Sequence, residues 1–127
     1  MGIYAQCTDF AKEKGLPLVN SDGYVSDGHL NTLTMSEGEE INMHRPLYKG
    51  LSYRIVFIAD ENIQTIGILV KDSEKRRIMN KVYKGKAVIW DVTPSENLEL
   101  TIGMLIPYAG LEEMKQGCVA MLVGVRN

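Results

Sequence analysis

Residues 97–107, NLELTIGMLIP, show the clearest alternation of apolar and polar side chains in the chain. The apolar positions of one face are Leu98, Leu100, Ile102, Met104 and Ile106. Because successive side chains of a β-strand point to opposite faces, this period of two predicts a strand with one buried face. The fold class depends on whether the rest of the chain repeats the pattern.

Six further segments show the same alternation, or a short apolar run between turn residues. They are 39–48 (EEINMHRPLY), 51–60 (LSYRIVFIAD), 63–72 (IQTIGILVKD), 76–83 (RRIMNKVY), 87–93 (AVIWDVT) and 117–125 (GCVAMLVGV). Turn-forming residues separate them, and no long amphipathic helix intervenes. The sequence therefore predicts one all-β domain over residues 1–127, an antiparallel β-sandwich of about eight strands with a short N-terminal helix. Jelly-roll-like or Greek-key connections are expected, and a closed barrel is the alternative.

Two segments have the composition of sheet edges. Pro46 cannot donate a ladder hydrogen bond, which predicts an edge strand or a bulge around it. Residues 71–86 contain seven Lys and Arg against two acids, and such basic residues discourage edge-to-edge pairing. We interpret this basic segment as a solvated hairpin edge, with an anion-binding patch as the alternative.

The alternation also predicts which side chains are covered. Trp90 lies in phase with Val88 and Val92, which indicates a core position. The second face of LSYRIVFIAD becomes apolar at Val56 and Ile58, as expected of a strand that enters a covered region.

The first 31 residues have a different character. Residues 7–15, CTDFAKEKG, predict a short helix that Thr8 caps and Gly15 ends, with Pro17 just beyond it. Residues 20–31, NSDGYVSDGHLN, contain two Ser-Asp-Gly triplets and predict turns rather than a regular element.

The two cysteines allow two interpretations. Cys7 lies in the predicted helix and Cys118 begins the last predicted strand. They could be independent buried thiols, since free cysteine is commonly buried. They could instead form a disulfide that ties the N-terminal segment to the last strand, which requires an oxidising compartment. A C-x-x-C spacing is absent, which argues against the common zinc and thioredoxin-like patterns.

Charge and hydropathy argue against two classes of protein, nucleic-acid-binding proteins and proteins with a membrane-spanning helix. The formal net charge is −2, whereas nucleic-acid binding requires a basic footprint, so nucleic acid is not an expected partner. No apolar run approaches the roughly 18 residues of a membrane-spanning helix, so no transmembrane segment is expected.

The sequence contains no pattern that identifies a reaction. The only histidines are His29 and His44, and no Gly-x-Ser-x-Gly elbow accompanies them, so we predict no catalytic residues, no enzyme activity and no cofactor. Asp22 and Asp27 of the two triplets are the candidates for Ca²⁺ ligands. Asp-Gly pairs are above all turn formers, however, and the EF-hand pattern is not matched.

Four tyrosines lie within two residues of a predicted turn glycine or proline. They are Tyr24, Tyr48, Tyr83 and Tyr108. A tyrosine combines an apolar ring with a polar tip. If these loops gather at one end of the sandwich, the rings would form a rim that binds a ligand.

Four stretches covering nearly the whole chain resemble a group of small exported proteins of unassigned function from Gram-negative anaerobes. The stretches are AQCTDFAKEKGLP, LTMSEGEEINMHRPLYKGLSYRIVF, VIWDVTPSENLELTIGMLIP and GCVAMLVG. The segment MSEGEEINMHRPLYKGLSYRIVF is also similar to jelly-roll domains found C-terminal to secreted peptidases, which assist folding or substrate attachment. Both resemblances rest on structural motifs and imply no catalytic residues.

The first resemblance has an implication for localisation. It implies a signal-peptidase cut just before the Ala-Gln-Cys start, so residues 1–6 would comprise an added Met-Gly leader and a cleavage remnant. The protein would then be periplasmic or secreted. We expect a non-catalytic binding or structural accessory module with an unidentified protein or glycan partner. The alternative is a carbohydrate-binding module that uses the loop tyrosines. In that alternative, Ca²⁺ bound at the Ser-Asp-Gly triplets could assist sugar binding.

Overall fold

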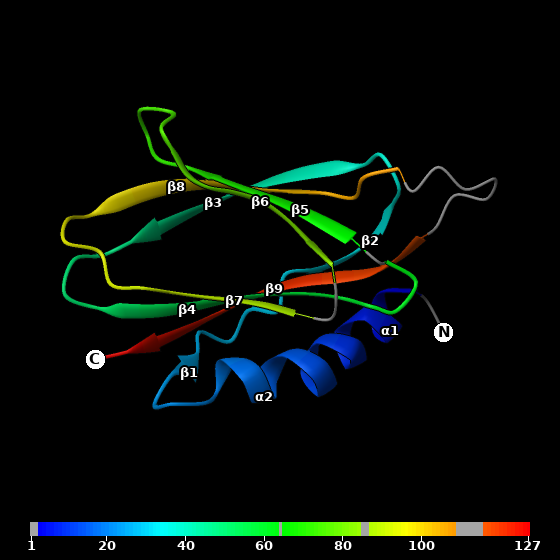
Figure 1. Cartoon of the computed structure of the whole chain (residues 1–127). Helices are drawn as coiled ribbons and strands as arrows, with labels where there is room; N and C mark the ends of the chain where they lie inside the picture. Colours follow the sequence, from blue (N-terminus) through cyan, green and yellow to red (C-terminus); the bar gives the residue numbers. More distant parts are fainter. Residues whose placement is uncertain (1–2, 64, 85–86, 109–115) are drawn as a thin grey trace.

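The computed structural model describes residues 3–63, 65–84, 87–108 and 116–127. In these ranges nine strands form two antiparallel sheets packed face to face, with a helical segment beneath one of them (Figure 1). The strands are β1 (Val25–Ser26), β2 (Thr32–Ser36), β3 (Glu40–Leu47), β4 (Ser52–Ala59), β5 (Thr65–Lys71), β6 (Arg77–Lys84), β7 (Ala87–Val92), β8 (Leu98–Leu105) and β9 (Gln116–Arg126). We call the sheet of β1, β2, β9, β4 and β7 sheet A, and the sheet of β3, β8, β5 and β6 sheet B.

The strand pairs are nested in the sequence. Strand β2 pairs with β9, β3 with β8, β4 with β7, and β5 with β6, all antiparallel. Pairs β4–β9 and β5–β8 complete the two sheets. The chain is thus one long hairpin folded about the β5–β6 turn, and successive pairs of it fall alternately into sheet A and sheet B. This is the jelly-roll arrangement, and it confirms the predicted all-β sandwich.

The core lies between the inner faces of the two sheets. It contains the alternating apolar residues of the predicted strands, and Tyr53, Phe57, Leu100 and Ile102 are among its fully buried members. Burying a side chain of this size contributes roughly 1.5–3 kcal/mol. Trp90 packs against this core from the edge strand β7, as its phase predicts, although its ring stays partly exposed.

Each edge prediction is confirmed by the strand order. Strand β3, which contains Pro46, lies at one edge of sheet B, and the basic strand β6 lies at the other. The turn before β6 is closed by Asp72, whose carboxylate accepts hydrogen bonds from the backbone N–H groups of Glu74 and Arg76, both at 2.9 Å.

Strands β1 and β2 were not anticipated from the sequence. They pair with the same side of β9, so together they form one edge strand of sheet A, interrupted at residues 27–31. Gly28 and Asn31 take positive φ angles of 90° and 44° in this interruption. The second Ser-Asp-Gly triplet therefore does form a turn, as predicted. That turn interrupts an edge strand instead of replacing it.

The N-terminal helical segment is longer than predicted. It runs through α1 (Ile3–Phe10), the π-helical turn η1 (Ala11–Gly15) and α2 (Leu16–Val19). Gly15 does not end it, and Thr8 lies inside α1 rather than capping it. The Leu16 N–H donates to the Ala11 carbonyl, five residues back, which widens the helix just before Pro17. A π turn relieves the clash and the lost hydrogen bond that proline causes inside a helix.

Gly15 is required by packing instead. A Cβ at this position would lie 2.7 Å from Cδ1 of Leu122 on β9. The helical segment therefore lies close against the outer face of sheet A, where a second core forms around Ala11, Val19, Val56 and Leu122. This confirms that the second face of β4 enters a covered region. No helix among the described residues is long and apolar enough to cross a membrane.

Candidate functional site

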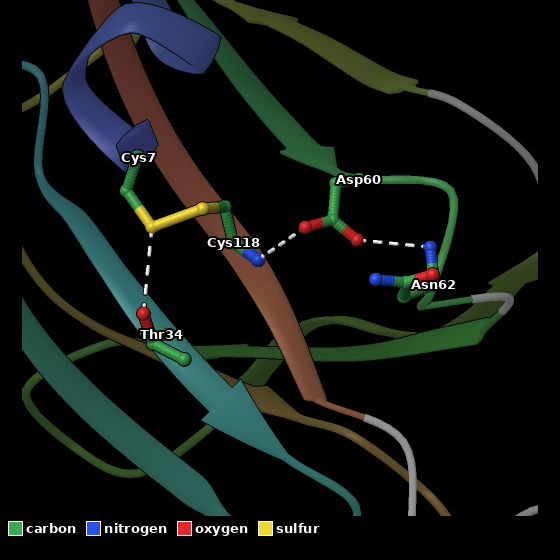
Figure 2. Close-up of a disulfide and its surroundings, with 5 residues drawn as sticks. All are labelled: Cys7, Thr34, Asp60, Asn62 and Cys118. Carbon is green, nitrogen blue, oxygen red and sulfur yellow. Dashed lines mark hydrogen bonds between the residues drawn. A yellow bond between two sulfur atoms is a disulfide. The ribbon is translucent and has the colours of Figure 1, made fainter. Parts of the chain in front are cut away.

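The two cysteines form a disulfide between α1 and the start of β9 (Figure 2). Their Cα atoms are 5.3 Å apart, and 111 residues separate them in the sequence. The Cys7 sulfur lies 3.4 Å from the Thr34 hydroxyl on β2. The disulfide interpretation is the one that the structure shows, and it fastens the helical segment to sheet A.

Asp60 supports the same region from the β4–β5 turn. Its carboxylate accepts hydrogen bonds from the Cys118 N–H at 2.6 Å and from the Asn62 N–H at 2.9 Å (Figure 2). A Cβ on Gly117 would overlap this carboxylate, so the residue before the disulfide must be glycine for Asp60 to approach. The arrangement orders a turn and a strand start, which is a structural role.

Arg54 is the centre of a polar cluster on the outer face of sheet A. Its guanidinium donates to both oxygens of Asp91 at 2.7 and 2.8 Å, and to the Ser21 hydroxyl at 2.6 Å. Its Nη1 also lies 3.0 Å from the Asp22 carboxylate. The guanidinium carbons of Arg54 and Arg126 lie 4.6 and 4.5 Å from the centre of the Tyr24 ring. These contacts fix the turn that follows the helical segment.

The pKa values of Arg54 and Asp91 are both shifted toward the charged forms of these groups. The hydrogen bonds to Asp91 raise the pKa of Arg54, and the hydrogen bond from Arg54 lowers the pKa of Asp91 below its ordinary value. Both groups therefore stay ionised at neutral pH, which suits a structural ion pair better than proton transfer.

The two candidate Ca²⁺ ligands face arginines. Asp22 contacts Arg54, and Asp27 Oδ2 lies 3.0 Å from Nη1 of Arg45. The described residues contain no group of three or more His, Cys, Asp or Glu side chains placed to hold a metal. The triplets act as turns: Gly23 and Gly28 both take positive φ angles.

The four tyrosines do not gather into one rim. Tyr48 follows the end of β3 at which Leu47 pairs with Leu98, whereas Tyr108 lies beyond the Glu40–Leu105 end of the same strand pair. Tyr83 lies near that second end. Tyr24 is 5% exposed and is held between arginines on the outer face of sheet A. Tyr48 is therefore at one end of the sandwich, Tyr83 and Tyr108 are near the other, and Tyr24 is on the outer face of sheet A.

A cleft of about 390 Å³ lies at the open edge between the two sheets, where β3 faces the 27–31 loop. Its lining residues are His29, Asn31, Met43, His44, Arg45 and Met121. The volume is within the range of small-ligand sites. The cleft brings together residues that lie far apart in the sequence, including both histidines.

An ion pair fixes one side of this cleft. Arg45 Nη1 lies beside Asp27 Oδ2, and Asp27 Oδ1 accepts a hydrogen bond from the His29 N–H at 2.9 Å. Nε of Arg45 is buried and makes no hydrogen bond within the described part of the chain. The sequence did carry a signal for this site: Arg45 stands on the otherwise apolar face of Ile41, Met43 and Leu47.

The outer face of sheet B carries exposed apolar side chains. Leu105 pairs with Gly67, and Gly67 pairs with Val82, so the three lie in one row across β8, β5 and β6. Leu105 is 38% and Val82 65% exposed. Leu69 lies in the next row, half-buried. We call Leu69, Val82 and Leu105 the sheet-B patch.

Comparison with known proteins adds no assignment: no family model matches the chain, and no curated protein matches it significantly.

Proposed function

We propose that this chain is an exported, non-catalytic accessory module that binds a protein partner against the sheet-B patch. The carrying observation is the contrast between the two outer faces of the sandwich. The outer face of sheet A is covered by the chain's own helical segment (Figure 1), whereas the outer face of sheet B presents Leu105 and Val82 to solvent. Contiguous exposed apolar side chains are typical of interaction surfaces.

The shape of the patch supports a partner that lies across the strands. Gly67 has no side chain between Leu105 and Val82, so the row is low at its centre and raised on both sides. An apolar side chain of the partner can enter this depression and contact both neighbours. Such central, desolvated contacts carry most of the binding energy in protein interfaces.

The charges beside the patch indicate the chemistry of the partner. Lys71 follows Leu69 by two residues on β5, and Lys84 follows Val82 by two residues on β6, so both lysines share the outer face. The exposed Glu40 pairs with Leu105 at the β3 end of the same row. We therefore commit to an amphipathic protein segment whose apolar residues are flanked by Asp or Glu on the side that lies over β5 and β6. Complementary charges at the rim favour association and orient the partner.

Two observations support export. The Cys7–Cys118 disulfide is typical of an oxidising compartment, and the resemblance to small exported proteins points the same way. Measuring the mass of the protein isolated from its own cells, before and after thiol alkylation, tests this part. A fully alkylated Cys7 and Cys118 in that sample would contradict export.

Selection of displayed random peptides against the folded, oxidised protein tests the binding surface. We expect enriched peptides to carry apolar residues flanked by acids, and to shift the methyl NMR signals of Leu69, Val82 and Leu105. Val82→Asp or Lys84→Glu should weaken the enriched peptides roughly tenfold. The matched controls are Ile89→Asp, on the exposed edge of sheet A, and Lys49→Glu, in the β3–β4 turn.

Peptides that shift no methyl signal of the patch, or that the control variants weaken as much as Val82→Asp does, would exclude the sheet-B patch as the docking site. Binding of glycans at the loop tyrosines instead would favour the carbohydrate-binding alternative, which the split placement of the tyrosines does not support.

A further inference from the structure

Arg45 carries a hydrogen-bond donor that the protein itself does not use. Its Nη1 lies 3.0 Å from Asp27 Oδ2, in an ion pair without hydrogen-bond alignment, and its Nε is buried with no acceptor among the described residues. A buried donor without a partner is costly, because it has lost its water and gained nothing in exchange. Since Arg45 lines the open-edge cleft, a ligand in that cleft can supply the missing acceptor.

Arg54 shows how a guanidinium in the same situation is completed elsewhere in this molecule. Its Nη1 also lies 3.0 Å from one carboxylate, that of Asp22. Its Nε and Nη2 donate to the two oxygens of a second carboxylate, that of Asp91, at 2.7 and 2.8 Å. The planar guanidinium matches a carboxylate in this two-point geometry. Arg45 has the first of these two carboxylates, and within the described ranges nothing takes the position that Asp91 has on Arg54.

We propose that the open-edge cleft binds a small organic carboxylate, whose two oxygens accept hydrogen bonds from Nε and Nη2 of Arg45. Met43 and Met121 line the same cleft, and their adaptable thioether side chains offer a surface for an apolar group next to the carboxylate. A free acid and the C-terminal carboxylate of a peptide share this chemistry. The site has no residue in common with the sheet-B patch.

Access to the guanidinium distinguishes Arg45 from Arg54. The side chain of Arg45 is 26% exposed, whereas that of Arg54 is 9% exposed. Nε of Arg45 is covered in the ligand-free protein, so binding requires a small movement of the cleft lining. His29 and Asn31 line the cleft from the exposed 27–31 loop, and this loop is the element that has to move.

The Asp27 carboxylate should limit the affinity for an anion. Arg54 accommodates two carboxylates, but those of Asp22 and Asp91 are 70% and 44% exposed, whereas that of Asp27 is 13% exposed. Solvent therefore screens the Asp27 charge less than the other two. A ligand carboxylate beside Arg45 is repelled by this charge, so removing the charge should strengthen binding.

Titration of the intact oxidised protein with isovalerate and with N-acetyl-leucine tests the proposal, and N-acetyl-leucinamide is the neutral control. We expect saturable one-to-one binding of the two acids that shifts the Nε–H NMR signal of Arg45 and leaves that of Arg54 in place. The amide should bind at least roughly tenfold more weakly. Equal affinities for the two acids would identify a free acid as a sufficient ligand, whereas a preference for N-acetyl-leucine would indicate a peptide C-terminus.

Substitutions of the two members of the ion pair should act in opposite directions. Arg45→Lys keeps the positive charge beside Asp27 but loses the two-point geometry, so it should weaken binding of both acids roughly tenfold. Asp27→Asn removes the repulsion and should tighten binding roughly threefold to tenfold. Damage to the fold cannot produce a tightening. The matched control is Asp22→Asn beside Arg54, which should leave the affinity unchanged.

Three results of the titration would overturn the assignment: no saturable binding of either acid, equal binding of the amide, or a shift of the Arg54 signal instead of the Arg45 signal. An Asp27→Asn variant that binds the acids no more tightly than the wild type would also overturn it. None of these results bears on the peptide experiment with Val82 and Lys84, so the two proposals fail separately.

Discussion

Arg54 and Asp91 are directly opposite each other on β4 and β7, and two hydrogen bonds of 2.7 and 2.8 Å join their side chains. Arg54 is only 7% exposed although it stands on an outer face of the sandwich. The turn that follows the helical segment covers it, with Ser21 and Tyr24 in contact. The pair therefore links the edge of sheet A to the segment that covers that sheet.

The Arg54–Asp91 pair predicts a loss of stability in acid. The pKa of Asp91 is lower in the folded protein than the unfolded value of about 3.9, because the carboxylate accepts hydrogen bonds from Arg54. Its contribution to stability is therefore present above pH 4 and is lost as the pH falls through the folded pKa. Solvent screens this partly exposed carboxylate, so we expect a contribution of about 1 kcal/mol.

Urea unfolding of the wild type and of Asp91→Asn at several pH values between about 2 and 7 measures this effect. The variant should be less stable at neutral pH, and the difference should shrink toward pH 2. A difference that is constant over this range would show that the Asp91 charge does not contribute.

Removing the disulfide should destabilise the protein strongly. The bond closes a loop across 111 residues, for which chain entropy predicts about 4–5 kcal/mol, although measured gains are often smaller. We expect Cys7→Ser with Cys118→Ser to lower the free energy of unfolding by about 2–5 kcal/mol. Hydrogen exchange should show that α1 loses more protection than β5. Equal loss in both would contradict a local anchoring role.

Gly124→Ala should loosen the contact between the helical segment and sheet A. A Cβ at this position would lie 2.9 Å from Cγ2 and 3.0 Å from the carbonyl oxygen of Val19. The backbone must move, and overpacking of this kind costs about 1–3 kcal/mol. Gly67→Ala is the matched control, because its nearest neighbour would be 3.6 Å away. Thermal unfolding of both variants compares them, and equal melting temperatures would refute the prediction.

Tyr53→Phe should remove a tie between β4 and the turn before it. The Tyr53 hydroxyl accepts a hydrogen bond of 2.8 Å from the Tyr48 N–H, and the Tyr53 ring is buried. Deleting the hydroxyl leaves a partly buried donor without its acceptor, which costs about 1 kcal/mol. Tyr48→Phe keeps that backbone donor and should be neutral. Denaturant unfolding that finds both variants equally stable would speak against the tie.

Much of the fold could be predicted because a strand with one buried face has alternating apolar and polar residues in its sequence. The seven predicted segments are all strands, and Pro46 and the basic segment placed two edges correctly. Strands β1 and β2 were missed because residues 27–31 interrupt them and leave pieces too short to show a period. The extension of the helical segment past Gly15 was missed because glycine there serves packing against Leu122, which no local pattern reveals.

The functional surfaces were less predictable, because they depend on strand register. The disulfide was one of two interpretations of the cysteine pair, since two cysteines permit one bond but can also remain free thiols. The Arg54–Asp91 pair and the row of Leu105, Gly67 and Val82 arise only when particular residues face each other across strands. The tyrosine rim was conditional on the loops lying at one end, and proximity to turns does not determine at which end of the sandwich each turn lies.

The nested order of the strand pairs also sets an order of events during folding. Strands β5 and β6 meet across residues 72–76, whereas β2 and β9 join opposite ends of the chain. Each inner pair shortens the loop that the next pair must close, so the entropic cost favours zipping from β5–β6 outward. Cys118 lies within this outermost pair, opposite Thr34 on β2, and Cys7 precedes β2 in α1, so this order of pairing brings the two sulfur atoms together last. Formation of this disulfide is therefore expected to be a late event in folding. Because the chain has two cysteines, neither has an incorrect intramolecular partner.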